Sequence, residues 1–268
     1  MRLRIAHTTI YHYDPPAFGA IQLLRLTPRN HDGQYVVRWR IDVSPDARLS
    51  VREDAFGNTT HAFSAAGPLR QLSVAIDGEV ETHGTHGVVR GTVERFPPSL
   101  FLRETTLTQP DATIGEFAED VIAAGGGETL PSLHLLLHRL HAEMTYDLAL
   151  TNTPMNAAQA FGIKRGVCRD LTHIFIAAAR SFAVPARYVA GYMQLADGTV
   201  AQEAGHAWAE AFVPDLGWVG FDPANGICPT EAYVRVAIGL DALGAAPVRG
   251  TRYGTGAESL EVAIRIDQ

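Results

Sequence analysis

The amino-acid sequence predicts a mixed α+β protein in which an antiparallel β-sandwich precedes a domain of helices packed on an antiparallel sheet. Apolar residues recur at every second position through much of the first hundred residues, which is the period of a half-buried strand. Between residues 114 and 182 they recur at helical spacing, and after Pro185 the period returns to two. The 268 residues suffice for one large domain or two ordinary ones with full hydrophobic cores.

The composition and charge exclude several classes of protein. Hydrophobic residues make up 46% of the chain and charged residues 19%, and no apolar run is long enough for a membrane span. The net charge is −7 at pH 7, and the 22 Lys and Arg residues are scattered, so there is no basic stripe that would bind nucleic acid. We therefore expect neither nucleic acid nor a membrane as a partner.

The cysteine content and the N-terminus indicate the compartment. Cys168 and Cys228 are too few for a disulfide framework and do not stand at the spacing of a metal site. The first nine residues lack the apolar run of a signal peptide. We expect a cytoplasmic protein.

The N-terminal β-region is predicted from alternating segments. A strand at residues 35–43 has one apolar face, formed by Tyr35, Val37, Trp39, Ile41 and Val43. Residues 72–76 repeat the alternation, and residues 56–58 between them favour a turn. The Pro-Pro pair at residues 97–98 cannot extend a central strand. We therefore assign residues 1–98 to a β-rich N-terminal domain and residues 99–268 to a second domain.

The second domain begins with predicted helices. The first is expected to open with a capping box formed by Thr113 and Glu116, and to end at the glycines of residues 125–127. Leucines at helical spacing predict a second helix over residues 133–144, and a short helix follows Asn156. A third strong helical pattern begins at Cys168 and extends to Phe182.

Strands are predicted for the rest of the chain. They cover residues 187–191, 206–213 and 218–222, and residues 260–266 alternate like a closing strand.

Cys168 is the first candidate for a catalytic residue. Because it opens a helical pattern, its sulfur is predicted at a helix N-terminus, where the dipole and unpaired N–H groups favour a thiolate. The alternative is a small buried hydrophobic residue without a chemical role. Asp170 is interpreted as a first-turn carboxylate that favours the helix dipole or pairs with an arginine such as Arg187.

A cysteine nucleophile needs a base and a third group that orients the base, and His206 and Asp222 are the best candidates. His206 opens one predicted strand, and Asp222 ends the next strand just before Pro223. Their side chains meet only if both lie on one sheet face. In a regular hairpin the residue numbers of each opposing pair must then sum to an even number, as for 212 with 218. The loop has an odd number of residues, such as 214–216, or a bulge supplies the extra residue.

Four motifs in this order resemble the transglutaminase-like superfamily, in particular the bacterial transglutaminase-like proteins with a β-rich domain ahead of the core. The motifs are Gly166-Val167-Cys168-Arg169-Asp170, Pro185-Ala186-Arg187-Tyr188-Val189-Ala190-Gly191-Tyr192, His206-Ala207-Trp208-Ala209-Glu210 and Gly217-Trp218-Val219-Gly220-Phe221-Asp222-Pro223. The N-terminal segments at residues 11–13, 24–29 and 54–58 also resemble that family.

The resemblance implies a papain-like, transglutaminase-core cysteine domain, in which the helix bearing the cysteine packs on an antiparallel sheet. It assigns Cys168 as the nucleophile, His206 as the base and Asp222 as the orienting residue. The implied reaction is acyl transfer from a side-chain or peptide amide through a thioester, which water or a primary amine resolves. No cofactor and no metal are implied, and the expected partner is a protein or peptide substrate.

Two questions stay open at this point. Trp208 and Tyr146 either line the substrate cleft or pack in an aromatic core, and Trp208, Trp218 and Phe221 are candidates for the apolar wall of an amine channel. The alternative to an enzyme is a catalytically silent module that binds a peptide or protein through the same cleft. Hydrolysis is the default reaction that we expect.

Overall fold

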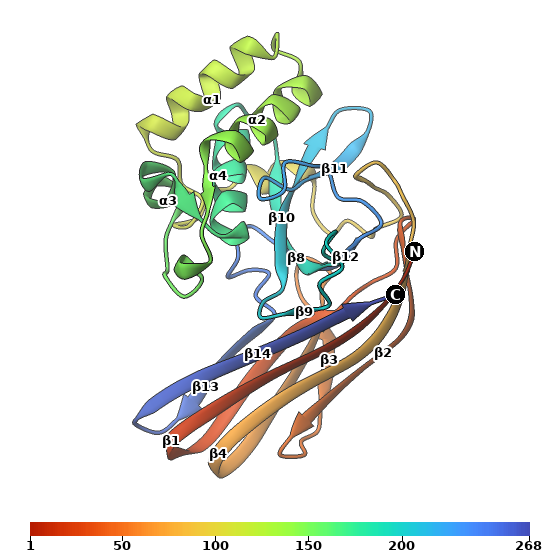
Figure 1. Ribbon diagram of the computed structural model, residues 1–268, viewed down its shortest axis with the longest axis vertical. Helices are drawn as coiled ribbons and strands as arrows, with labels where there is room; N and C mark the ends of the chain where they lie inside the picture. The colour runs from red at the N-terminus through yellow and green to blue at the C-terminus, as the bar shows by residue number, and fades with distance from the viewer.

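The computed structural model describes residues 1–268 and has two large β-sheets, with helices against one of them, and a third sheet of two short strands (Figure 1). Sandwich strands fill the lower part of Figure 1, and the helices lie at the top, beside the second sheet. The strands are β1 (Arg2–Thr27), β2 (Gln34–Ser44), β3 (Ser50–Glu53), β4 (Thr59–Thr82), β5 (Val88–Val89), β6 (Thr145–Tyr146), β7 (Arg165–Gly166), β8 (Ala186–Met193), β9 (Ala201–Gln202), β10 (His206–Val213), β11 (Gly217–Phe221), β12 (Tyr233–Gly239), β13 (Val248–Tyr253) and β14 (Ala257–Asp267). The helices are α1 (Ala112–Ala124), α2 (Thr129–Glu143), α3 (Ala157–Ile163), α4 (Cys168–Ser181) and the short 3₁₀ helices η1 (Pro98–Leu102) and η2 (Leu148–Leu150).

The N-terminal sandwich is one sheet that folds back on itself. β1 and β4 pair antiparallel along almost their whole length, with register shifts between His12 and Gly19 where both strands bend. The first half of β1 pairs with β14 and the second half with β13. A single buried cluster lies between the two layers and contains Tyr13, Ala17, Ala20, Leu24, Leu26, Phe63, Ala65, Leu69, Leu72, Val74 and Ile76.

The last strands of the chain join the first sheet. β14 is the predicted closing strand, and it pairs with β1 from Arg4–Asp267 to Asp14–Ala257. The two chain ends therefore lie side by side (Figure 1). Conversely, β5 comes from the N-terminal part of the chain but pairs with β11 in the second sheet. The boundary predicted at residue 98 thus does not separate the two sheets, because alternation along a strand says nothing about which sheet the strand joins.

The apolar face predicted for residues 35–43 is wrong at its start. Tyr35 is 55% exposed and Val37 is 38% exposed, whereas Trp39, Ile41 and Val43 are partly buried as predicted. A register shift between Val36 and Arg38 against β4 explains the difference. A bulge adds one residue, so the faces before and after it are exchanged.

The second sheet has the order β12-β8-β10-β11-β5 and carries the helices on one face. The alanines of β10, at residues 207, 209 and 211, share a core with the apolar side of α4, so the two elements approach closely. The other face of this sheet packs around Phe101, Trp208 and Trp218. None of the helices combines the length and apolar character that a membrane span requires.

The predicted helices are present, with one difference at a cap. α1 begins after Asp111, whose carboxylate accepts the Ile114 backbone N–H at 2.9 Å, and the expected box of Thr113 and Glu116 does not form the cap. Asp and Thr are both preferred N-cap residues, so the residue types alone do not decide between Asp111 and Thr113. α4 begins at Cys168, as predicted.

Candidate active site

Cys168 is the first residue of α4 and is partly buried. The start of the helix is held by Asp170, whose carboxylate accepts the Val167 backbone N–H at 3.1 Å. The Thr172 hydroxyl donates to the Cys168 carbonyl at 2.7 Å. The first N–H groups of a helix have no intrahelical partner, so the Cys168 sulfur lies beside backbone donors and the positive end of the helix dipole.

The hairpin of β10 and β11 has the register that the sequence predicts for a meeting of His206 with Asp222. Phe212 pairs with Trp218, and the loop consists of residues 214–216. Asp215 has φ 66° and Gly217 has φ 89°, the left-handed conformations that a three-residue loop with a bulge requires. The even register places both catalytic candidates on one face of the sheet.

His206 and Asp222 form a short hydrogen bond in a nearly dry environment. His206 Nε2 lies 2.6 Å from Asp222 Oδ2, and the two side chains are 8% and 0% exposed. Since Nε2 is occupied by the carboxylate, Nδ1 is the ring nitrogen left to face the Cys168 thiol, whose charge also acts on the ring. The structure thus brings together the three residues that the sequence singled out, from α4, β10 and the end of β11.

Two residues that sequence reasoning missed complete the surroundings of Asp222. Its Oδ2 also accepts the Tyr233 hydroxyl and the Asn225 side-chain amide, each at 2.7 Å. Its Oδ1 accepts the Ala224 backbone N–H at 3.0 Å. Tyr233 is the first residue of β12, and alternation along residues 233–239 indicates a strand but not its neighbour. Asn225 belongs to the turn after Pro223, and nothing in its spacing indicates the contact.

The charges of the site favour an imidazolium beside the thiol. Burial by itself lowers the pKa of His206, but hydrogen bonds and charges from Asp222 and Cys168 outweigh it and raise the pKa to about 10. Burial raises the pKa of Asp222, yet the hydrogen bonds from His206, Asn225 and Tyr233 bring it below its ordinary value. His206 is therefore protonated and Asp222 ionised through the neutral range.

The two predicted cleft residues have different positions. Tyr146 in β6 is 47% exposed, and its strand pairs with β7 so that it lies beside Gly166, two residues before the nucleophile. Burial, followed by the charge and hydrogen bond of the Cys168 thiol, raises the pKa of the Tyr146 hydroxyl. Trp208 is only 2% exposed and stacks behind the His206 ring at 6.2 Å between centroids. Trp208 thus packs in the buried cluster with Phe101, Trp218 and Tyr233.

Asp170 does not pair with Arg187, which was one of its expected partners. Its neighbour Arg169 donates to it at 3.0 Å. Arg187 belongs instead to a buried network, in which it donates to Glu210 and to Glu94, each at 2.7 Å. Arg187 and Glu210 are completely buried, so each charge needs a partner of opposite charge to offset the loss of water. No group of three His, Cys, Asp or Glu side chains is arranged to hold a metal ion.

Comparison with protein families finds two matches along the chain. Residues 3–81 match the bacterial transglutaminase-like N-terminal region. Residues 116–223 match the transglutaminase-like superfamily. The first match covers much of the sandwich, and the second includes Cys168, His206 and Asp222.

Individual proteins are also similar to this chain. The chain is 28% identical over 279 residues to the uncharacterized protein ML0607 of Mycobacterium leprae, covering 99% of this chain and 98% of that protein. It is 25% identical over 179 residues to an uncharacterized protein of Haemophilus influenzae, covering 54% of this chain and 48% of the relative. A solved structure described as a "Putative Cysteine Protease from Cytophaga hutchinsonii" has a TM-score of 0.77 at 19% identity, covering 100% of this chain and 90% of the other. At that identity the likeness concerns the fold.

Proposed function

The chain belongs to the transglutaminase-like superfamily, and from this membership we propose that it catalyses cysteine-dependent acyl transfer from an amide of a peptide or protein. The observation that carries the proposal is the arrangement of His206. Its Nε2 is held at 2.6 Å by a completely buried carboxylate, which leaves Nδ1 for the thiol at the start of α4. This is the geometry of a nucleophile, a base and an orienting group.

In the first step the Cys168 sulfur attacks the carbonyl carbon of the amide. The oxyanion accepts the Cys168 backbone N–H, and we assign the second donor to the Tyr146 hydroxyl, because Tyr146 lies beside Gly166, two residues before the nucleophile. The C–N bond breaks as Nδ1 of His206 gives its proton to the leaving nitrogen. Ammonia or an amine departs, and a thioester on Cys168 and a neutral imidazole remain.

In the second step His206 acts as the base. It takes a proton from the attacking water or amine at Nδ1, the new C–O or C–N bond forms, and the C–S bond breaks. The thiolate and imidazolium are restored. Throughout both steps Asp222 stays ionised and keeps Nε2 protonated, so the ring presents Nδ1 to the reaction.

Water is the acceptor that we expect. Trp208, Trp218 and Phe221, the residues that the sequence offered for an apolar amine channel, are 2%, 4% and 0% exposed. They pack in the cores on the two faces of the sheet and form no channel wall. Without such a wall, an amine has no apolar route that excludes competing water.

The experiment offers a glutamine-containing peptide library together with an excess of a labelled primary amine, and measures hydrolysed and amine-linked products by mass. We expect hydrolysed product to dominate, and Cys168→Ala to form neither product. Dominant amine incorporation would reverse the acceptor assignment. No product from parent or Cys168→Ala, together with peptide binding by both, would support the silent binding module instead.

A further inference from the structure

β12 is an outer strand of the second sheet, and its free edge faces the N-terminal sandwich. One edge of β12 pairs with β8. On the other edge the backbone N–H and C=O of Arg235 and Ile238 point away from β8. Residues three apart normally face opposite edges, and the register shift between Arg235 and Ala237 brings these two onto the same edge. A buried edge of this kind needs hydrogen-bond partners.

Two side-chain amides from the sandwich region supply those partners. Gln34 donates to the Arg235 carbonyl at 2.9 Å and accepts the Arg235 N–H at 2.8 Å. Asn58 forms the same pair with Ile238, with both distances 2.8 Å. The amides are only 2% and 4% exposed. Each one therefore imitates a residue of a neighbouring strand, and together they replace the strand that β12 lacks on this side.

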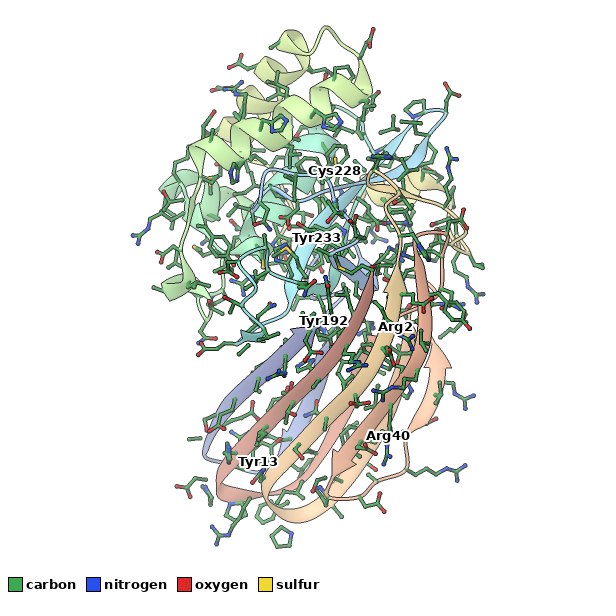
Figure 2. All side chains as sticks on the ribbon, turned by 45° about the vertical axis from the view of Figure 1, so that its right-hand side comes forward. Arg2, Tyr13, Arg40, Tyr192, Cys228 and Tyr233 are labelled. Atoms are coloured by element: carbon green, nitrogen blue, oxygen red, sulfur yellow. The ribbon has the colours of Figure 1, made fainter.

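The strand held in this way carries a residue of the active site. Tyr233 begins β12, and its hydroxyl donates to Asp222 Oδ2 at 2.7 Å. Its ring packs against His206 and Trp208, with centroids 5.8 Å and 5.4 Å apart. Figure 2 shows Tyr233 near the level where the upper part of the molecule meets the sandwich, with Tyr192 just below it. Tyr233 lies beyond residue 223, where the match to the superfamily core ends.

We propose that Gln34 and Asn58 are positioning residues for the catalytic site: by fixing the edge of β12, they hold the Tyr233 hydroxyl on Asp222 and thereby the orientation of His206. This inference rests on the proposed function, and it assigns to the N-terminal sandwich the role of positioning β12 for catalysis. The sandwich completes the catalytic domain, and the line of contacts runs from Gln34 through the β12 backbone and Tyr233 to Asp222.

The readout is the pH dependence of Cys168 alkylation by iodoacetamide, followed by peptide mass mapping, with Cys228 in the same sample as the internal reference. The titratable groups facing His206 are Cys168 from α4, Asp222 from the end of β11 and Tyr233 from β12. The alkaline break of the profile is the pH above which His206 loses its proton and the alkylation rate of Cys168 changes. A variant that loosens Asp222 therefore moves this break, whereas a loss of stability alone does not.

The first variants are Gln34→Met and Tyr233→Phe. Gln34→Met keeps a similar volume and removes both hydrogen bonds to Arg235, together with the one that Gln34 donates to the Arg29 carbonyl. We expect each to move the alkaline break toward lower pH and to lower the kcat of amide cleavage about tenfold with little change in KM. The double variant should match Tyr233→Phe alone within about twofold, because both changes act through one route. Leu69→Ala, a change in the sandwich core at the bend of β1 and β4, is the matched control and should leave the profile unchanged.

Gln34→Glu provides a second variant if Gln34→Met does not fold. It keeps the acceptor for the Arg235 N–H and loses the donor, so its profile should lie between those of the parent and Tyr233→Phe. An unchanged break in a folded Gln34 variant, or effects of Gln34→Met and Tyr233→Phe that multiply independently, would overturn the inference. His206→Ala distinguishes a failure of the proposed function from a failure of this inference. If this variant leaves the Cys168 profile unchanged, the proposed catalytic function fails. If it removes the break, the result for Gln34 alone decides the inference.

Discussion

Replacing Asp222 with Asn is the smallest change that tests how the carboxylate controls His206. In the parent, Oδ2 accepts three donors, from His206, Asn225 and Tyr233, and Oδ1 accepts the backbone N–H of Ala224. An amide has one oxygen and one NH₂ group. In either orientation the NH₂ group faces donors that previously bonded to oxygen, and the side chain is completely buried, so water does not compensate.

The effect on His206 follows from its pKa. The difference between the ordinary value of 6.5 and about 10 corresponds to about 5 kcal/mol in favour of the imidazolium. Burial opposes that preference, so without the carboxylate we expect the pKa of His206 in Asp222→Asn to fall to 6.5 or below. An NH₂ group facing Nε2 also favours the tautomer with its proton on Nδ1, which is unable to accept a proton there. Loss of the correct tautomer lowers kcat about 10⁴-fold in triad enzymes, or about 5 kcal/mol of barrier.

The assay combines steady-state cleavage of a peptide amide with an NMR titration of the His206 ring. We expect the lower pKa, the changed tautomer and the loss of kcat together, with KM little altered. Asn225→Ala is a comparison variant, since it removes one donor to Asp222 and leaves the charge. A folded Asp222→Asn protein whose His206 still titrates near pH 10, or whose kcat lies within tenfold of the parent, would refute this account of the site.

Three further predictions concern other groups. Amide cleavage should decline as the pH rises through about 10, where His206 loses the proton that the leaving nitrogen needs, and initial rates between pH 6 and 11 measure this limb. Tyr146→Phe should lower kcat about 100-fold by removing an oxyanion donor, with single-turnover kinetics as the test and an effect below twofold as the contrary result. Glu210→Gln should destabilise the protein by about 3 kcal/mol in urea unfolding, because it leaves Arg187 and Arg235 with one carboxylate fewer in a buried network. Burial raises the pKa of Glu210, but the two arginines lower it to about 2, so the stability that the carboxylate contributes is present above pH 4.5 and lost as the pH falls through about 2.

The parts of the site that could be predicted from the sequence are those with a local signature. Cys168 could be placed at a helix start because the helical period begins at that residue. Strand parity stated the hairpin register that a meeting of His206 with Asp222 requires, and the hairpin has that register. Both arguments use only distances along one helix or one hairpin, where geometry is nearly fixed by residue spacing.

Contacts between distant segments were not accessible in the same way. Gln34 and Arg235 are 201 residues apart, and a side-chain amide that pairs with a backbone edge leaves no periodic pattern. Tyr233 was missed for a related reason, because its role depends on which strand lies beside Asp222. The bulge at residues 36–38 likewise exchanged the faces of β2, since a single inserted residue is invisible to an alternation count.

The covalent thioester on Cys168 is the central claim, and trapping it is the most direct test. A peptide with an activated glutamine ester is mixed with the protein, quenched in acid within one turnover and analysed by intact mass and peptide mapping. The account predicts an adduct with the mass of the acyl group on Cys168, formed at the rate of the first product, absent in Cys168→Ala and accumulating in His206→Ala, where deacylation lacks its base. Turnover without any adduct, or cleavage that continues in Cys168→Ala, would contradict it.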